Sequence, residues 1–316
     1  MIKIQNEHLE KYAKEHYNHL KNKLTEFPKN CKYSLEEVIT AKPEKLHEIA
    51  QWFRPNFETM KFRVTTRITP TVLLLQSVGR GNPSWLPSKS NYDFMIDKYK
   101  SFTRKKKREY DAYDLASKLQ VNVCSYCNLN ATYTVIVEGN KKITRPEFDH
   151  FYDKATYPIL ALSFYNLIPS CHICNATLKG SEKFSIETHL NPYSESFDTL
   201  AKFKLKIKDS SFYHAINGFD LALESEDKRA KNSIKSFELE TLYQNHKDII
   251  LELIQKEAIY NESYLDELLT QYEGTLFKNR EDLQRLISGG YVSDEEIGKR
   301  PLSKLIKDIS EELGLR

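Results

Sequence analysis

Four of the five cysteines form two Cys-x-x-Cys pairs, Cys124 with Cys127 and Cys171 with Cys174. The two-residue spacing lets both thiolates of one turn face the same ion, and four thiolates complete a tetrahedral zinc site. Disulfides are disfavoured in a reducing compartment, and the sequence begins without the apolar core of a secretory signal. We therefore expect all four cysteines to hold one structural zinc.

The 43 residues between the two pairs are more than a zinc ribbon needs, so the zinc closes a loop large enough to hold a second site. Asp149 and His150 lie inside this loop with Asn166, and Asn175 follows it. An imidazole can deprotonate water near neutral pH, and carboxylate and amide oxygens suit a Mg²⁺-type ion. A lone Asp-His pair is more often structural, but these residues together fit phosphodiester hydrolysis.

Short elements must position these side chains. The stretch "YTVIVEGNKKITRPEF" alternates like a β-hairpin with its turn at Gly139 and Asn140, and we expect its second strand to end at Asp149-His150. The apolar "YPILALSFYNLIPS" predicts a buried turn or short helix and then a strand. A short helix, "CNATLKG", stops at Gly180. The expected order inside the loop is strand, strand, helix.

This pattern resembles the HNH endonuclease family, also called His-Me finger nucleases. The matching text is "FDHFYDK", "SFYNLIPSC" and "CHICNATLKG", within about residues 120–185. The resemblance implies a ββα-metal core in which His150 is the general base and Asp149 and Asn175 hold one divalent ion. It also implies that Asn166 ties the loop through backbone hydrogen bonds and orients His150. The third position of the motif is Asn175 rather than a histidine. His172 is the alternative candidate for this metal-binding role, although its place between the zinc cysteines points it outward.

The text flanking this motif narrows the resemblance. "YDAYDLASKLQVNVCSYCN", "HLNPYSESF" and "FELETLYQNHKDIILELI" look like PtuB, the HNH subunit of Septu-type anti-phage systems, which accompanies the ATPase PtuA. That resemblance implies an ATPase partner that holds or gates the nuclease. An HNH protein of restriction or mobile-element type that acts alone differs only in its partner. DNA, RNA and tRNA all remain open as targets.

Basic residues gather around the motif, since residues 101–180 contain 11 Lys and Arg against 7 Asp and Glu. Such a cluster attracts phosphate backbones, but the run at 104–108 also fits a solvated helix start. Lys154 and Lys179 are either phosphate contacts or ordinary surface lysines. We expect Tyr126, Phe151 and Tyr152 to pack around the zinc rather than to stack on bases. The candidate contacts in the run are Arg104, Lys105, Lys106, Lys107 and Arg108.

The whole chain of 316 residues is 40% hydrophobic and 29% charged, as in an ordinary soluble protein, and no apolar run is long enough to span a membrane. We expect a cytoplasmic, mostly helical α+β protein. Its predicted regions are a helical region at 1–115, the zinc-bound core with a small sheet at 116–225, and a helical region at 226–316. Sheet strands are expected in "FKLKIKDSSFYHAINGFDLAL".

The last helix carries an apolar stripe of Leu302, Leu305, Ile306, Ile309 and Leu313. Such stripes more often pack in the core and otherwise form a partner surface, and this one is the first candidate docking surface for the ATPase. An alternative to the enzyme is a zinc-stabilised module that grips nucleic acid or protein without cutting. Such a module needs the cysteines and the basic run but not Asp149, His150 and Asn175, and their joint presence favours the enzyme.

Overall fold

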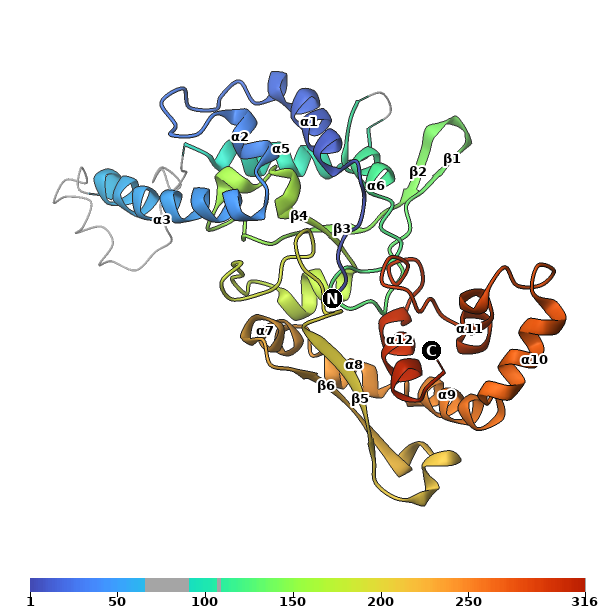
Figure 1. Cartoon of the computed structure of the whole chain (residues 1–316). Helices are drawn as coiled ribbons and strands as arrows, with labels where there is room; N and C mark the ends of the chain where they lie inside the picture. The colour runs from blue at the N-terminus through green and yellow to red at the C-terminus, as the bar shows by residue number, and fades with distance from the viewer. Residues whose placement is uncertain (66–90, 107–108, 316) are drawn as a thin grey trace. The chain divides into compact units, whose positions relative to one another are not determined.

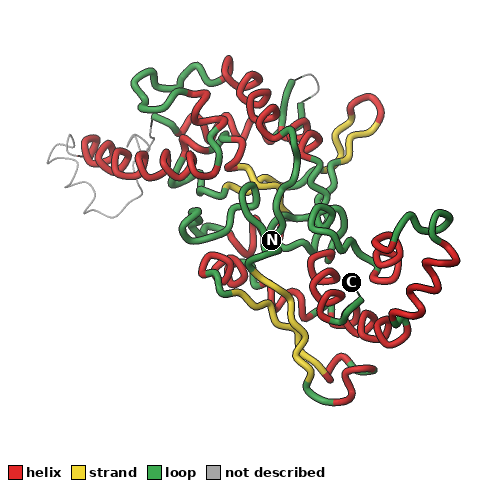
Figure 2. The backbone as a smooth tube through the Cα atoms, viewed as in Figure 1, coloured by secondary structure: helices red, strands yellow, loops and turns green. Residues whose placement is uncertain are grey.

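The computed structural model describes residues 1–65, 91–106 and 109–315. Helices make up most of the regular structure, and the strands in this part of the chain form three two-stranded sheets (Figures 1 and 2). The predicted α+β, mostly helical class is therefore confirmed. No helix among the described residues combines the length and the apolar character needed to cross a membrane.

The chain divides into two compact units. Unit 1 contains Met1–Glu7, Ala116–Asp149 and Ile168–Arg316, and unit 2 contains His8–Leu115 and His150–Leu167. This division differs from the three regions predicted from the sequence, because the chain passes from one unit to the other between Asp149 and His150. The two residues of the Asp-His motif thus belong to different units.

Unit 2 is built from helices around the buried segment 158–166. Helix α2 begins with a capping box, in which the Ser34 hydroxyl accepts from the Glu37 backbone and the Glu37 carboxylate accepts from the Ser34 backbone. Helices α2 and α5 pack on the first short helix of the segment, and α2 and α3 on the second. The elements are α1 Leu9–Leu20, η1 Lys21–Lys23, α2 Leu35–Thr40, α3 Pro43–Thr65, α5 Asp93–Thr103, η3 Pro158–Leu160 and η4 Phe164–Asn166, followed across the boundary by α6 Ala112–Leu119.

The predicted hairpin is present in unit 1 as β1 (Val135–Val137) and β2 (Lys141–Thr144). Its turn places Gly139 and Asn140 at φ 72° and 60°, the left-handed region that glycine and asparagine tolerate best. The predicted end of the second strand is wrong, because β2 stops at Thr144. Pro146 follows it, and a proline has no N–H to donate to a strand ladder.

Asp149 and His150 instead end a separate strand, β3 (Glu147–His150), which pairs with β4 (Leu167–Ser170). A short helix, η5 (Ile173–Lys179), comes next, so the predicted order of strand, strand and helix is confirmed. This helix has the wider π-type winding, with the Gly180 N–H donating to the Asn175 carbonyl at 3.2 Å. Gly180 ends it at φ 49°.

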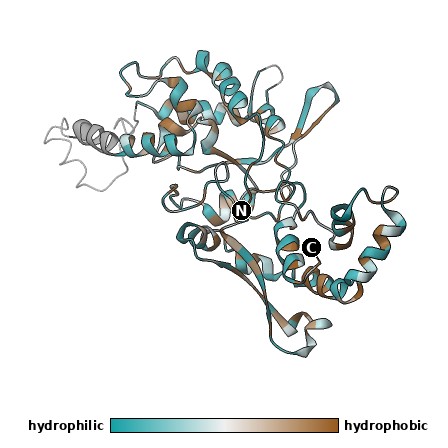
Figure 3. Cartoon of the chain, in the orientation of Figure 1, coloured by the Kyte–Doolittle hydropathy of each residue, from teal (hydrophilic) through white to brown (hydrophobic). Residues whose placement is uncertain are grey.

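The rest of unit 1 contains the predicted small sheet and the predicted C-terminal helices. Strands β5 (Ala201–Ile207) and β6 (Phe219–Ser225) pair antiparallel along their whole length. The helices carry hydrophobic and hydrophilic residues side by side (Figure 3). Several begin at a side-chain cap, such as Asp227 before α7 and Asn279 before α11. They are α7 Lys228–Ser236, α8 Leu239–Gln244, α9 Lys247–Ile259, α10 Glu262–Tyr272, α11 Arg280–Ser288 and α12 Ser303–Glu312.

Helix α12 is a core helix, so the core-packing alternative for its apolar stripe is confirmed and the exposed docking surface on it is wrong. Leu305, Ile306 and Ile309 are 0%, 5% and 0% exposed, since α12 packs against β5 and α9. Its opposite side is also covered, where Lys304 Nζ lies 2.7 Å from both carboxylate oxygens of Asp308. A buried ion pair of this kind compensates two charges that would each be costly alone.

Candidate functional site

The four predicted cysteines converge in unit 1. Their sulfur atoms all lie within 4.8 Å of one another, and the described residues contain one such group of potential metal ligands. A tetrahedral ion with sulfur ligands at about 2.3 Å needs sulfurs roughly 4 Å apart, so these four side chains can hold a metal ion. Cys124, Cys127 and Cys174 are at most 1% exposed and Cys171 is 9% exposed.

Backbone and amide groups surround the cluster with hydrogen-bond donors. The Cys171 N–H points at the Cys124 sulfur at 3.3 Å, and the Leu129 N–H points at the Cys127 sulfur at 3.4 Å. The Asn130 side chain donates to the Cys171 sulfur at 3.4 Å. Such donors stabilise sulfur in the charged form that binds metal.

The thiols also perturb one another. Hydrogen bonds from Cys124, Cys127 and Cys174 hold the pKa of Cys171 far below its ordinary value. Burial, followed by hydrogen bonds to its neighbours, raises the pKa of Cys124. Thiols this close together do not ionise independently, because neighbouring thiolates repel one another. A bound divalent cation offsets this repulsion, since it favours the thiolate form at every position.

The first cysteine knuckle is anchored to the C-terminal helices. Asn128, which is fully buried, accepts the Lys304 N–H on its side-chain oxygen at 2.9 Å and donates to the Ile297 carbonyl at 3.0 Å. Asn128 thereby supplies the cap that the first turn of α12 lacks from its own residues. The Tyr243 hydroxyl donates to the Cys127 carbonyl at 2.6 Å. These contacts give the C-terminal region a structural role at the cluster.

Asp149 is buried, with 3% of its surface exposed, and both of its carboxylate oxygens have a protein partner. The Tyr126 hydroxyl donates to Oδ2 at 2.6 Å, and Lys179 Nζ lies 3.0 Å from Oδ1. Burial and the nearby Asp149 carboxylate raise the pKa of Tyr126 well above its usual range, so the phenol remains a donor. Neither partner of Asp149 was predicted from the sequence.

Lys179 was predicted to be a phosphate contact or a surface lysine, and the surface-lysine alternative is wrong because the side chain is buried. It is 4% exposed, forms a buried ion pair with Asp149, and lies 5.0 Å from the centre of the Phe184 ring. The winding of η5 explains the difference, because residue 179 ends that helix on the side that meets β3.

Asn175 and His172 meet a carboxylate that sequence reasoning missed. The Asn175 side-chain nitrogen donates to Glu147 Oε2 at 2.7 Å, and His172 Nδ1 lies 2.8 Å from Glu147 Oε1. His172 points outward as predicted, with 73% of its side chain exposed. Glu147 stands two residues before Asp149 in β3, and alternate residues of a strand share one face, so its position could have been noticed.

His150 lies in unit 2 and is 4% exposed. Its Nε2 is 2.9 Å from the Ala161 carbonyl, which can only accept, so the proton belongs on Nε2 and Nδ1 is the basic nitrogen. The Tyr99 ring from α5 meets the imidazole edge to face, with ring centres 4.4 Å apart. Backbone and aromatic contacts thus fix both the tautomer and the orientation of the ring.

Asn166 ties the loop that follows His150. Its side-chain oxygen accepts the Tyr152 N–H at 2.7 Å, and its nitrogen donates to the Tyr152 and Leu160 carbonyls, both at 3.0 Å. The Phe151 N–H donates to the Asn166 carbonyl at 3.0 Å. Asn166 is fully buried, so these bonds hold the residues that follow His150 and the residue that precedes Ala161 without competition from water.

The basic run lies between α5 and α6, and only part of it can be described. Arg104 and Lys105 are exposed, whereas Lys106 Nζ is 3.2 Å from Glu109. Lys107 and Arg108 lie outside the described residues. Lys154 Nζ is 5.8 Å from the centre of the Tyr99 ring, the same ring that contacts His150.

The aromatic residues of the motif are buried, so none offers a stacking platform; Tyr126 lies in the first cysteine knuckle as predicted, whereas Phe151 and Tyr152 belong to unit 2 and not to the unit that contains the cysteines. Tyr126, Phe151 and Tyr152 are 0%, 0% and 1% exposed. Tyr126 stacks on Phe237 with ring centres 4.3 Å apart, and Tyr152 accepts or donates a hydrogen bond with His47 at 3.0 Å.

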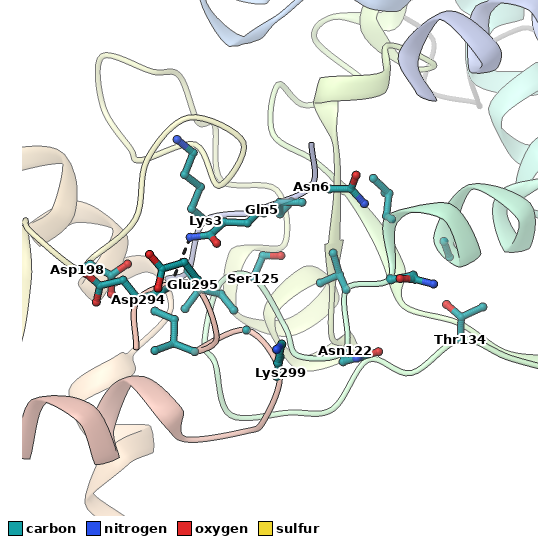
Figure 4. A pocket seen from close by; sticks show the side chains of 18 of the residues that line it. Lys3, Gln5, Asn6, Asn122, Ser125, Thr134, Asp198, Asp294, Glu295 and Lys299 are labelled. Carbon is teal, nitrogen blue, oxygen red and sulfur yellow. Dashed lines mark hydrogen bonds between the residues drawn. The ribbon is translucent and has the colours of Figure 1, made fainter. Parts of the chain in front are cut away.

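A pocket of about 540 Å³ in unit 1 lies behind the first knuckle (Figure 4). Asp198, Asp294 and Glu295 gather at one end, Thr134 lies at the other, and Ser125 of the knuckle lies between them. The residues that line the pocket include none of the predicted catalytic or cysteine ligand residues. It therefore supplies no part of the chemistry expected at Asp149 and His150.

Comparison of the chain with models of protein families, with curated proteins and with solved structures found no match.

Proposed function

We propose that this protein is a metal-dependent endonuclease of the HNH type that hydrolyses phosphodiester bonds of nucleic acid in the cytoplasm. The observation that carries the proposal is the state of His150, whose Nε2 is held by the Ala161 carbonyl inside a loop tied by Asn166. An imidazole with a fixed tautomer and orientation is what a general base requires.

The four-cysteine cluster, whose two pairs flank the Asp-His motif in the sequence, also supports the proposal. We assign zinc to it because four buried thiolates in two Cys-x-x-Cys turns are the ligand set of structural zinc sites. The ion would join residues 124–127 to residues 171–174, and so fix both ends of the chain that carries Asp149 and His150. Its role in this proposal is structural, with no position left open for substrate.

A second ion, Mg²⁺ or a similar divalent cation, is assigned to Asp149 and Asn175, where it would neutralise charge on the phosphoryl and leaving oxygens. Each carboxylate oxygen of Asp149 has a lone pair besides the one used by Tyr126 or Lys179. The Asn175 nitrogen is committed to Glu147, which orients the amide and leaves its oxygen as the ligand atom. His150 would take the proton of the attacking water on Nδ1.

One observation favours a different class, a zinc-stabilised module that binds nucleic acid or protein without cutting. Asp149 is 3% exposed and its charge is already paired with Lys179, as in a purely structural carboxylate. This module would bind nucleic acid through Arg104, Lys105 and Lys154 with a strong salt dependence and no need for Mg²⁺.

Incubation of the purified chain with plasmid DNA, single-stranded DNA, RNA and tRNA separates the two functions. The nuclease requires Mg²⁺-dependent strand cleavage that EDTA stops while zinc remains bound, and it requires Asp149→Ala and Asn175→Ala to raise the Mg²⁺ concentration needed. Binding that retards the nucleic acid in a gel with no cleavage at any divalent ion concentration would favour the module.

We further propose an ATPase partner, as the resemblance to PtuB implies. The proposed ββα unit fills a small part of the chain, and an unrestrained nuclease would endanger its host. Because α12 is buried, the surface to test is the exposed apolar set on α9, α11 and the turn between α10 and α11, where Ile259, Leu286 and Leu276 are 61%, 66% and 70% exposed. Unchanged copurification of Leu276→Asp/Leu286→Asp with the ATPase would exclude this surface.

A further inference from the structure

Tyr126 connects the cysteine cluster to the candidate ion site. It lies between Cys124 and Cys127 in the first knuckle, its ring is fully buried, and it stacks on Phe237 at an interplanar angle of 23°. Its hydroxyl reaches the Asp149 carboxylate at 2.6 Å, across 23 residues of sequence. One side chain of the metal-binding turn therefore touches the strand that carries the proposed Mg²⁺ ligand.

The two donors on Asp149 act differently. Lys179 brings a positive charge, which competes with a divalent cation for the same carboxylate. Tyr126 brings a neutral hydroxyl, which fixes the carboxylate without cancelling its charge. A carboxylate whose rotation is fixed by a hydrogen bond loses less conformational freedom when it binds an ion, and partners of this kind typically change metal affinity by 10- to 100-fold.

We infer that Tyr126 is a positioning residue for the divalent ion site: held in place by the cysteine knuckle, it presets the Asp149 carboxylate for the ion. The inference rests on the proposed role of Asp149 as a metal ligand. It also gives the cysteine cluster a second role. The structural metal orders residues 124–127, and the Tyr126 hydroxyl in this segment in turn orients the Asp149 carboxylate.

The chain offers a matched pair of variants. Tyr126→Phe removes the hydroxyl and keeps the ring that stacks on Phe237. Tyr243→Phe is the control, because Tyr243 of α8 is also buried and its hydroxyl donates to the Cys127 carbonyl at 2.6 Å. This variant removes a hydroxyl that contacts the same knuckle but leaves Asp149 untouched. The measurements are Mn²⁺ binding by electron paramagnetic resonance, zinc content, and the Mg²⁺ dependence of cleavage.

We expect Tyr126→Phe to bind Mn²⁺ about 10- to 100-fold more weakly than the parent protein, with unchanged zinc content. Tyr243→Phe should bind Mn²⁺ like the parent. The inference is overturned if Tyr126→Phe binds Mn²⁺ within twofold of the parent, if both variants weaken it equally, or if Tyr126→Phe loses zinc, since Tyr126 would then support the cluster itself. A parent protein that binds no Mn²⁺ would instead refute the proposed role of Asp149, and with it this inference.

Discussion

The two candidate metal sites differ in what satisfies their ligands. At the cysteine cluster, four sulfur atoms lie within 4.8 Å of one another. At Asp149, a tyrosine hydroxyl and a lysine ammonium already occupy both oxygens of the carboxylate. The first arrangement gives a cation four sulfur ligands, whereas in the second the carboxylate charge is already compensated by an ammonium group. The comparison predicts a permanent ion at the cysteines and an exchangeable ion at Asp149.

Removing the cysteine cluster should have the largest effect. The variant Cys127→Ser/Cys174→Ser should lose its zinc and most of its cooperative thermal transition, because structural zinc contributes on the order of 10 kcal/mol in small domains. Metal analysis and calorimetry measure both effects. Cys31→Ser is the control, since Cys31 lies outside the cluster and should leave zinc content at one ion per chain. A zinc-free but thermally unchanged double variant would show that these cysteines are no structural site.

Breaking the ion pair at Asp149 should come next. Lys179→Met leaves a buried carboxylate without its counter-charge, which typically costs about 3–5 kcal/mol of unfolding free energy. Urea denaturation should show most of this loss recovered in Lys179→Met/Asp149→Asn, where no charge is left to compensate. Added Mn²⁺ should also stabilise Lys179→Met more than the parent, because the ion no longer competes with an ammonium group. Equal stabilisation of both would count against the competition.

Acid should destabilise the fold through His189, which lies near the Asp149–Lys179 pair. This imidazole stacks on Phe184, whose ring also lies under Lys179, and its Nε2 is 3.7 Å from Glu182. Burial lowers the pKa of His189 to about 4, below its value in the unfolded chain of about 6.5. The unfolded chain therefore takes up a proton in this window while the folded chain does not, so the unfolding free energy falls as pH drops from about 6.5 to 4.

Replacement of His189 by an uncharged side chain should flatten that pH dependence. Urea unfolding of His189→Gln at pH 7 and pH 5 should differ less than for the parent, and the exposed His214→Gln should behave like the parent. An identical pH slope in His189→Gln would place the acid-sensitive group elsewhere.

The sequence predicted the parts of the site that depend on local spacing. The two Cys-x-x-Cys turns, the hairpin turn at Gly139 and the helix end at Gly180 all depend on residues close in sequence, and all are present. The partners of Asp149 could not be predicted, because Tyr126 and Lys179 are 23 and 30 residues away and only the folded chain brings them together.

The α12 stripe shows the limit of periodicity. A repeat of apolar residues indicates which side chains share a helix face, but it does not say whether that face meets solvent or the protein's own sheet. Here β5 and α9 cover it. Likewise, Pro146 marked a break before β3 that the alternation of the preceding strand concealed.

The central claim, that His150 is the general base of a phosphodiester hydrolase, is tested most directly by comparing the Mg²⁺-dependent cleavage rates of the parent and His150→Ala under single-turnover conditions. The exposed His214→Ala, which lies outside the site, serves as the control. Loss of a general base removes about two to four decades of rate, so we predict that loss for His150→Ala, with zinc content and thermal stability close to those of the parent. Cleavage by His150→Ala at the parent rate would contradict the claim.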